Sequence, residues 1–339
     1  MNEIKIIGGG LTGLSLGIAL RKLEVPVTLH EASQYPRHKV CGEFINGVKK
    51  STLDYLGISP LFESALRHSK VDWFYKNKKF YSFKLSSPAL AISRYSLDEM
   101  LAETFQDMGG ELFTGSRMKA VESNGNVFAC GRRLKKESHW IGLKSHFSGL
   151  DLHSDLEMHI GNNCYLGLCR IEENKVNACG LFRKSEFADS SKGINLLNQY
   201  LIKNGLNALA ERLGDADPVE GAFKGVSAFS LGAVQKHEER LVLGDYHSII
   251  PPFTGNGMSM ALESAEVACN PLAKYANGED SWPQITESIK HGLNNKFKTR
   301  MRLSGWIHPL FFSNIGQRLL YYLGSARLIP MKTLSHFLK

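Results

Sequence analysis

The chain has 339 residues, 43% of them hydrophobic, which is enough for a large core and predicts two interleaved domains. Its 41 Lys and Arg against 33 Asp and Glu give a net charge of +8, but these basic residues are dispersed and form no recognised nucleic-acid motif, which argues against nucleic-acid binding. The six cysteines have no zinc-ligand spacing, so we expect no metal site, and no run approaches the roughly 18 apolar residues of a membrane span.

The first predicted elements form a nucleotide-binding unit. Residues 4–7 read as a short buried strand, and residues 11–23 carry apolar side chains at helical spacing. Between them, Gly8, Gly10 and Gly13 fit G-x-G-x-x-G, whose glycines allow a tight turn, close approach of a pyrophosphate, and close packing of helix on strand. The start of the helix would offer free N–H groups to the phosphates.

A second strand is predicted over residues 25–30 and is followed by Glu31. This acid stands 18 residues after Gly13, close to the spacing expected for a carboxylate on a ribose hydroxyl. An acid at this point favours FAD or NAD(H) over the 2′-phosphate of NADP. Because the chain enters its first strand at once, we also expect no signal peptide and a cytoplasmic protein with reduced thiols.

The middle of the chain mixes helices and strands. We expect a loop over 36–43 that opens onto a helix, and a later helix that begins with Ser96 as its N-cap. In chain order the expected elements are a helix over 46–57, strands within 71–92, a helix to about residue 108, and strands near 111–114, 117–122 and 127–130. Residues 140–230 are strand-rich with a helical insert near 193–214, which predicts an antiparallel substrate sheet.

A second glycine-rich segment follows the substrate sheet. It comprises Gly244-Asp245 and then Thr254-Gly255-Asn256-Gly257-Met258, within residues 240–275 that return to the nucleotide domain. The tail, 283–339, is helical, basic and rich in aromatic residues. We interpret it as a packed helical cap, with contact to a membrane or a lipid substrate as the alternative.

These landmarks together resemble the para-hydroxybenzoate hydroxylase-like FAD-dependent oxidoreductases, nearest the branch of geranylgeranyl reductases and flavin monooxygenases. The resemblance spans most of residues 1–275. It implies an α/β fold in which a Rossmann-like FAD-binding domain is interleaved with an antiparallel β-sheet substrate domain and followed by a helical C-terminal segment. The implied divisions are an FAD-binding domain over 1–70, 91–135 and 235–280, a substrate domain over 71–90 and 136–234, and a C-terminal segment over 281–339.

The resemblance also implies site residues. Arg94 would reach the cofactor phosphates, Asp98 would pin its helix, Asp245 would hold a ribityl hydroxyl, and the segment after Thr254 would cover the flavin pyrimidine. The implied cofactor-binding residues are Gly8, Gly10, Leu11, Thr12, Gly13, Glu31, Ala32, Lys39, Cys41, Gly42, Arg94, Met118, Gly244, Asp245, Gly255, Asn256, Gly257 and Met258.

The sequence departs from the related patterns at three points. The A-D-G segment of hydroxylases reads Ala129-Cys130-Gly131, without the acid. Residues 140–144 are not the W-x-W-x-I-P motif of halogenases, which argues against halogenation, and the aromatic Y-x-W-x-F-P motif of the reductase branch is missing. Residues 36–43 do resemble the P-x-x-K-x-C-G segment of that branch, whose cysteine lies beside the flavin ring, so Cys41 is the candidate catalytic residue; the alternative is a small buried apolar residue.

The sequence therefore predicts an FAD-dependent oxidoreductase with non-covalent FAD. The first hypothesis is a monooxygenase that acts on a small apolar, aromatic or lipid-like substrate, free or on a carrier, with NAD(P)H as a transient electron donor. The alternatives are a reductase of carbon–carbon double bonds and a flavin-binding, redox-responsive protein without turnover. The positive charge fits cofactor phosphates, an acidic carrier or a membrane surface.

Overall fold

A parallel sheet forms one half of the molecule. The computed structural model describes residues 1–118, 122–132, 138–184, 192–227, 231, 240–331 and 333–334. The sheet has five strands in the order β14 (Leu241–Val242), β7 (Asn126–Phe128), β1 (Ile4–Ile7), β2 (Val27–His30) and β6 (Glu111–Phe113), all paired in parallel. Both sides of such a sheet must be covered, and the neighbours Ile6 and Ile7 of β1, which lie on opposite faces, are both buried.

Helices from three parts of the chain cover this sheet. They are α1 (Leu11–Lys22), α3 (Arg94–Asp107) and α6 (Gly257–Ala276), with the short α2 (Lys50–Leu56) beside them. Gly17 allows α1 to pack closely on α3, because a Cβ at this position would lie 2.8 Å from the Phe105 ring. These helices and the sheet share one apolar core, which holds the ends of the strands in a fixed position relative to the helices.

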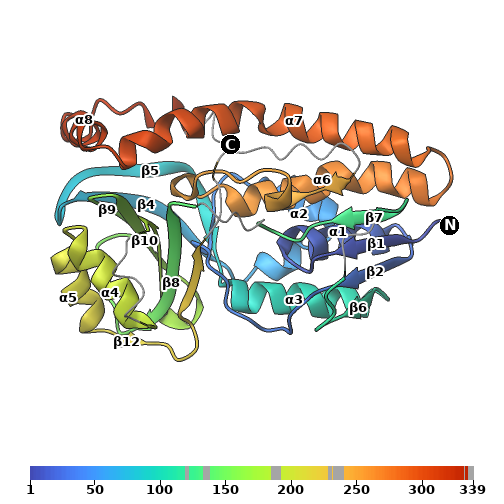
Figure 1. Cartoon of the computed structure of the whole chain (residues 1–339), viewed down its shortest axis with the longest axis horizontal. Coiled ribbons are helices and arrows are strands. Elements are labelled where there is room, and N and C mark those ends of the chain that lie inside the picture. The colour runs from blue at the N-terminus through green and yellow to red at the C-terminus, as the bar shows by residue number, and fades with distance from the viewer. Residues whose placement is uncertain are drawn as a thin grey trace.

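An antiparallel sheet forms the other half (Figure 1). Its strands follow the order β12 (Asp217–Pro218), β8 (Trp140–Ser148), β11 (Val176–Arg183), β10 (Cys164–Arg170), β9 (Leu156–Gly161), β4 (Leu66–Tyr75), β5 (Lys78–Ala91) and β3 (Phe44–Ile45), and β13 (Lys224–Ser227) also pairs with β8. Among the described residues, all strand pairs of this sheet are antiparallel except β4 with β9. Helices α4 (Ile194–Lys203) and α5 (Asn207–Gly214) pack against one face, as the predicted helical insert requires.

The C-terminal helices join the two halves. In Figure 1, α7 (Trp282–Ile307) runs along the top of the molecule from α6 toward the antiparallel sheet, and α8 (Asn314–Ser325) lies beside β5. A buried ion pair of 2.6 Å between Arg300 and Glu263 ties α7 to α6, and Gln317 of α8 donates a 2.8 Å hydrogen bond to the Gly161 carbonyl of β9. The packed helical cap predicted for the tail is confirmed.

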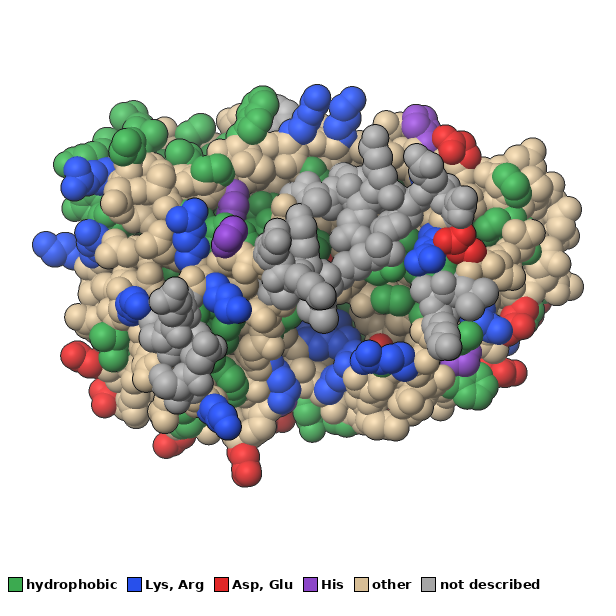
Figure 2. Space-filling view, in the orientation of Figure 1, with side chains coloured by type: hydrophobic (Ala, Val, Ile, Leu, Met, Phe, Trp, Pro, Cys, Tyr) green, Lys and Arg blue, Asp and Glu red, His purple; other side chains and the backbone are tan. Residues whose placement is uncertain are grey.

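Part of that cap leaves apolar side chains in solvent. Figure 2 shows hydrophobic side chains gathered at the upper left of the molecule, over α8 and the neighbouring end of α7. Among the described residues, no helix combines the length and the apolar character that crossing a bilayer requires.

Several predicted boundaries are wrong. Helix α3 begins at Arg94, because the Ser93 side chain is the N-cap and accepts a 3.0 Å hydrogen bond from the Ser96 amide, so Ser96 lies inside the first turn. The helix expected over 46–57 shortens to α2, which begins at Lys50, because Gly47 has a φ of +85° that no α-helix contains. Of the strand expected near 117–122, residues 117, 118 and 122 are not in a strand, and 119–121 lie outside the described residues.

Candidate functional site

The first glycine loop lies between β1 and α1. Gly8 has a φ of +112°, and a Cβ there would collide with the Ala129 carbonyl, while a Cβ on Gly13 would collide with the Gly8 carbonyl. These two glycines are therefore required by the packing of the chain itself. Gly10 differs, because a Cβ there would have the Lys39 Nζ, at 3.8 Å, as its nearest neighbour. The loop thus leaves space at Gly10, directly before the amide groups of the first turn of α1.

The second glycine segment lies against the first. Gly244, with a φ of +60°, follows β14, and a Cβ on it would collide with the Thr12 side chain. The Gly244 amide donates a 3.0 Å hydrogen bond to the Ser264 hydroxyl of α6. Because β1 and β14 are parallel, both segments leave the same edge of the sheet, which is the edge where doubly wound folds bind ligands.

The rest of the second segment opens α6. Gly255 has a φ of +66° and packs on Phe44, whose ring would lie 2.6 Å from an added Cβ. The Asn256 side chain donates a 3.1 Å hydrogen bond to the Asn46 carbonyl. Gly257 begins the helix, and in the described part of the chain no atom beyond its sequence neighbours lies within 4 Å of where its Cβ would be. A second helix start therefore faces open space.

Some of the predicted cofactor-binding residues have buried side chains, and others have exposed ones. Leu11 and Met258 are buried in the core of the parallel-sheet half, so only their backbone amides could meet a ligand. Met118 packs against Ile7, Phe128 and neighbouring side chains at the strand ends. Ala32 and Gly42 are exposed.

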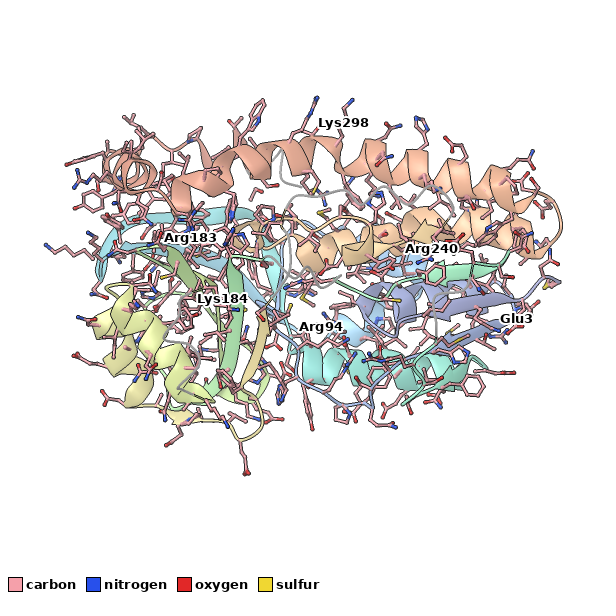
Figure 3. The ribbon with its side chains drawn as sticks, in the orientation of Figure 1. Glu3, Arg94, Arg183, Lys184, Arg240 and Lys298 are labelled. Carbon is pink, nitrogen blue, oxygen red and sulfur yellow. The ribbon has the colours of Figure 1, made fainter. Side chains whose placement is uncertain are left out.

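Two cations lie beside the first loop and share one buried carboxylate. Asp98 is fully buried and binds Arg94 through two contacts, of 2.6 Å and 2.8 Å, and Lys39 through a third, of 2.7 Å. Burial alone would raise the pKa of Asp98, but Arg94 and Lys39 outweigh it and lower that pKa. Figure 3 places Arg94 in the middle of the molecule, at the start of α3. The arrangement leaves a net positive charge near Gly10, suited to phosphate groups.

Glu31 holds the first loop in place. Its carboxylate accepts 2.9 Å hydrogen bonds from the Gly9 and Ser33 amides and pairs with Arg37 at 2.8 Å. Tyr35 donates a 2.5 Å hydrogen bond to the Gly9 carbonyl. Sequence reasoning missed Tyr35 and Arg37, although both follow the acid within six residues. The predicted contact of Glu31 with a ribose stays a prediction.

Asp245 has a partner that the sequence did not suggest. Its carboxylate pairs with Arg132 at 3.0 Å, between the segment after β14 and the segment after β7. Arg132 follows the Ala129-Cys130-Gly131 segment, which lacks the usual acid. Only narrow gaps, too small to admit a water molecule, lie beside Asp245, lined by Gly244, Asp245, Ser248, Ile250, Gly257, Met260, Ala261 and Phe297. A larger hollow, near Arg212 of α5, lies at a distance from all predicted site residues.

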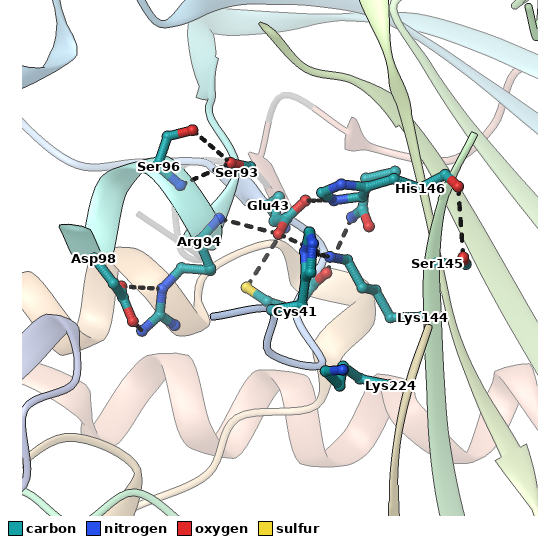
Figure 4. A network of polar contacts seen from close by, with 12 residues as sticks. Cys41, Glu43, Ser93, Arg94, Ser96, Asp98, Lys144, Ser145, His146 and Lys224 are labelled. Atoms are coloured by element: carbon teal, nitrogen blue, oxygen red, sulfur yellow. Dashed lines mark hydrogen bonds and ion pairs between the residues drawn. The ribbon is translucent and has the colours of Figure 1, made fainter. Parts of the chain in front are cut away.

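A buried polar network connects the Cys41 loop with the antiparallel sheet (Figure 4). Glu43 is fully buried and has a φ of +54°, a conformation uncommon for a residue with a side chain. One carboxylate oxygen accepts a 3.0 Å hydrogen bond from the Arg94 amide and lies 3.3 Å from the Lys144 Nζ; the other lies 2.6 Å from the His146 Nε2. Sequence reasoning missed this network.

Cys41 lies at the edge of the same network. The Glu43 amide donates a 3.4 Å hydrogen bond to the Cys41 sulfur, and the Asn177 side chain of β11 donates a 3.0 Å hydrogen bond to the Cys41 carbonyl. Burial raises the pKa of the Cys41 thiol. The thiol is therefore protonated at neutral pH and could donate a proton. Burial also lowers the pKa of Lys144, against the opposing effect of Glu43.

An aromatic cluster lies against the second glycine segment. The ring of Phe253 lies 4.6 Å from that of Phe311, and the Phe253 amide donates a 3.0 Å hydrogen bond to the Tyr165 hydroxyl. His308 and Phe312, 4.8 Å apart, complete the cluster with Trp140. Both ring nitrogens of His308 are buried and have no hydrogen-bond partner in the described part of the chain. The sequence predicts that the tail aromatics form a packed cap, with contact to a membrane or a lipid substrate as the alternative; their position beside Phe253 depends on the path of the chain.

Two half-buried histidines, His38 and His308, predict a loss of stability in mild acid. Burial lowers the pKa of His308 from 6.5 to about 4, and burial, then Lys144 and His146, lower that of His38 to about 4. As the pH falls from 6.5 toward 4, the unfolded chain takes up these protons and the folded chain does not, so stability decreases across this window.

We expect the melting temperature to decrease between pH 7 and pH 5, and to decrease less in His308→Phe than in the wild type. His291→Gln, which changes an exposed histidine of α7, serves as the control. Differential scanning fluorimetry at a series of pH values is the measurement. An equal decrease in the wild type and His308→Phe would show that His308 does not contribute.

Comparisons with known proteins were made for sequence and for structure. No protein-family model and no curated protein sequence matches the chain. Among solved structures, the flavin-dependent brominase Bmp2 is 18% identical with a TM-score of 0.76, over 99% of this chain and 93% of that chain. PqsL, a probable FAD-dependent monooxygenase from Pseudomonas aeruginosa, is 14% identical with a TM-score of 0.70, over 96% and 98%. A geranylgeranyl bacteriochlorophyll reductase-like protein from Thermoplasma acidophilum is 16% identical with a TM-score of 0.74, over 95% and 91%.

These similarities extend over almost the whole chain. At identities this low they show the fold. The chain shares its fold with these three proteins, and this fold has the parallel sheet, the antiparallel sheet and the C-terminal helices that the sequence predicted.

Proposed function

We propose that this protein is an FAD-dependent oxidoreductase of the monooxygenase type, which acts on a mostly apolar small molecule with electrons from NAD(P)H. The observation that carries the proposal is the contact between Thr12 and Gly244, which joins two glycine segments from opposite ends of the chain at one edge of the parallel sheet. Bound FAD would supply transfer of one or two electrons to or from its ring system, and the protein would position and polarise it.

The residues of the site fit such a cofactor. The open space at Gly10, the start of α1, and the cations Lys39 and Arg94 suit the pyrophosphate. Asp245 would accept a hydrogen bond from a ribityl hydroxyl, with Arg132 holding its carboxylate in place. The open start of α6 at Gly257 would favour negative charge on the pyrimidine side of the ring.

The aromatic cluster supports the class of substrate. Tyr165, Phe253, Phe311 and Phe312 pack on one another as an aromatic cluster next to the second glycine segment. The ring nitrogens of His308 provide a hydrogen-bonding pair that no described residue uses. A buried polar group without a partner costs free energy, and a hydroxyl or carbonyl of a bound substrate would recover it. We therefore propose an aromatic or otherwise flat apolar substrate with one such polar group.

The runner-up function is a reductase of carbon–carbon double bonds. One observation favours it: the Cys41 thiol, whose pKa is raised by burial, stays protonated and lies on the loop that resembles that branch. A thiol in this state could donate the proton that such a reduction needs.

The experiment that distinguishes these functions measures the reduction of bound FAD, the uptake of oxygen and the incorporation of oxygen into a product. Purified protein with added FAD is reduced anaerobically with NADH or NADPH and then exposed to air and candidate aromatic substrates. Incorporation of oxygen from labelled O2 into a product supports the monooxygenase. Reduction of an alkene without oxygen uptake supports the reductase. Failure of every donor to reduce bound FAD would contradict both and leave a binding role.

Substitution of Cys41 is expected to have different effects in a reductase and in a monooxygenase. Cys41→Ala should abolish product formation in a reductase while FAD still binds and NAD(P)H still reduces it, because the proton donor is lost. In a monooxygenase the same variant should retain substantial hydroxylation, because the thiol then only shapes the site. Stopped-flow reduction of the flavin together with product yield is the measurement, and Cys179→Ala, a second thiol on β11, is the matched control. A Cys41→Ala protein that binds no FAD would refute both expectations.

A further inference from the structure

The exposed apolar side chains at the C-terminal end of the molecule form one surface. We call it the α8 patch and define it by Trp306, Ile315, Leu319, Tyr322 and Leu328. Their exposed fractions are 79%, 85%, 47%, 68% and 66%. Ile315, Leu319 and Tyr322 follow the spacing i, i+4, i+7 and lie on one face of α8, between Trp306 at the end of α7 and Leu328 after α8.

The packing of α8 fixes this face toward solvent. On the opposite side, Gln317 donates hydrogen bonds to the carbonyls of Gly161 and Phe311, at 2.8 Å and 2.6 Å. Gly324 packs on β5, since an added Cβ would lie 2.6 Å from the Phe80 ring. The helix is therefore held in its orientation by buried contacts, and its outer apolar face is not the result of a loose terminus. An exposed apolar surface of this kind is typical of an interaction site.

The charge of the chain is concentrated in the same segment. From residue 288 to 339 there is no Asp or Glu, and there are nine Lys and Arg: Lys290, Lys296, Lys298, Arg300, Arg302, Arg318, Arg327, Lys332 and Lys339. The remaining 287 residues carry 41 − 9 = 32 basic and 33 acidic residues, a net charge of −1. The whole positive excess of the protein therefore belongs to its C-terminal segment.

Some of these cations border the α8 patch. Lys298 and Arg302 precede Trp306 by eight and four residues, on the same side of α7, and Arg318 and Arg327 stand next to Leu319 and Leu328 in the sequence. All four are exposed. Figure 2 shows Lys and Arg side chains next to the apolar group at the upper left.

We propose that the α8 patch docks this protein on the surface of an anionic lipid bilayer. Exposed Trp and Tyr with aliphatic side chains on one helix face, bordered by Lys and Arg, match the interface of a membrane, where rings insert at headgroup depth and cations meet lipid phosphates. A second copy of the chain fits less well, because a symmetric dimer would bring two strongly basic segments together. This inference does not depend on the proposed catalytic function.

Docking would bring lipid close to the candidate substrate site. His308 and Phe311 connect the end of α7 to α8, and both belong to the aromatic cluster that contacts Phe253. The bilayer surface would therefore lie against the same segment that covers the aromatic cluster. An apolar substrate dissolved in the membrane would have a short path to the protein.

The test is flotation of the purified full-length chain with vesicles. We expect binding to vesicles that contain about one third phosphatidylglycerol, weaker binding to pure phosphatidylcholine, and loss of much of the binding at about 0.5 M salt. Ile315→Asp combined with Leu319→Asp should weaken partitioning at least about tenfold, because two inserted aliphatic side chains become charged. Arg318→Glu combined with Arg327→Glu should also weaken it about tenfold or more, since each cation near an anionic surface contributes about fivefold.

Control variants test whether the loss of an exposed apolar side chain or an exposed cation elsewhere on the protein also weakens vesicle binding. Ile202→Asp changes an exposed apolar residue of α4 in the antiparallel-sheet half, and Lys50→Glu changes an exposed cation of α2; neither should change vesicle binding. Thermal melting establishes that each variant is folded. Equal vesicle binding by the patch variants and the wild type, or no binding to either lipid mixture, would overturn the proposal. So would a concentration-dependent dimer in size-exclusion chromatography that Ile315→Asp abolishes, because the patch would then be an interface between copies.

Discussion

Gly10→Val is expected to lower the affinity for FAD by at least about 100-fold, equivalent to about 3 kcal/mol of binding free energy. A side chain at this position enters the space in front of the first turn of α1, where we place the pyrophosphate. The folded chain itself should tolerate the change. Gly10 has an ordinary φ of −91°, and among the described residues beyond its sequence neighbours an added Cβ would have only the end of the flexible Lys39 side chain within 4 Å.

The neighbouring glycines provide the contrast. In Gly13→Val the new side chain would collide with the Gly8 carbonyl, so this variant should lose stability as well as FAD binding. Gly214→Val, at an open glycine of α5, should change neither FAD binding nor, by more than about 1 kcal/mol, stability. Titration of flavin fluorescence measures the affinity, and melting without FAD measures the fold. A Gly10→Val protein that is stable and binds FAD like the wild type would place the cofactor elsewhere.

Asp98→Ala is expected to destabilise the apo protein by about 3–5 kcal/mol, the usual cost of removing one partner from a buried ion pair. Asp98 is fully buried and is the shared anion for Arg94 and Lys39, so its loss leaves two cations without their carboxylate. The ionised form of Asp98 is the stabilising one. Its contribution is therefore present above the unfolded pKa of about 3.8 and is lost as the pH falls through the lowered folded pKa.

Urea unfolding measures this effect. The midpoint should fall while the slope stays unchanged, because the folded state keeps its size. Asp107→Ala, at the exposed end of the same helix, is the matched control and should change stability by less than about 0.5 kcal/mol. Saturating FAD should recover part of the loss in Asp98→Ala, since its phosphates would pair with the two cations. A loss below about 1 kcal/mol in Asp98→Ala would mean that the cations are solvated without it.

The elements that sequence could predict are those with a strong local pattern. The strand at residues 4–7 and the helix that follows were predicted within one residue, because the glycines, the apolar spacing and the later acid all agree. The meeting of the two glycine segments could be expected only through the resemblance. No local signal relates Thr12 to Gly244, and their contact depends on the strand order of the parallel sheet.

The polar network around Glu43 shows what local pattern cannot supply. His146 and Lys144 are more than 100 residues from Glu43 in sequence and reach it from one face of β8. In the sequence they stand among alternating strand residues and look like solvent-facing positions. Burial of all three, and the left-handed backbone of Glu43, come from the docking of the Cys41 loop onto the sheet. The same holds for His308, whose role depends on the path of α7.

The most direct test of the central claim is equilibrium titration of the purified apo chain with FAD, followed by flavin fluorescence and by melting temperature. We predict one FAD per chain, released by acid because it is non-covalent, with a melting temperature that increases as FAD is added. AMP, which lacks the flavin, should compete only weakly. A chain that is folded but shows neither quenching nor a shift of the melting temperature with FAD would contradict the account.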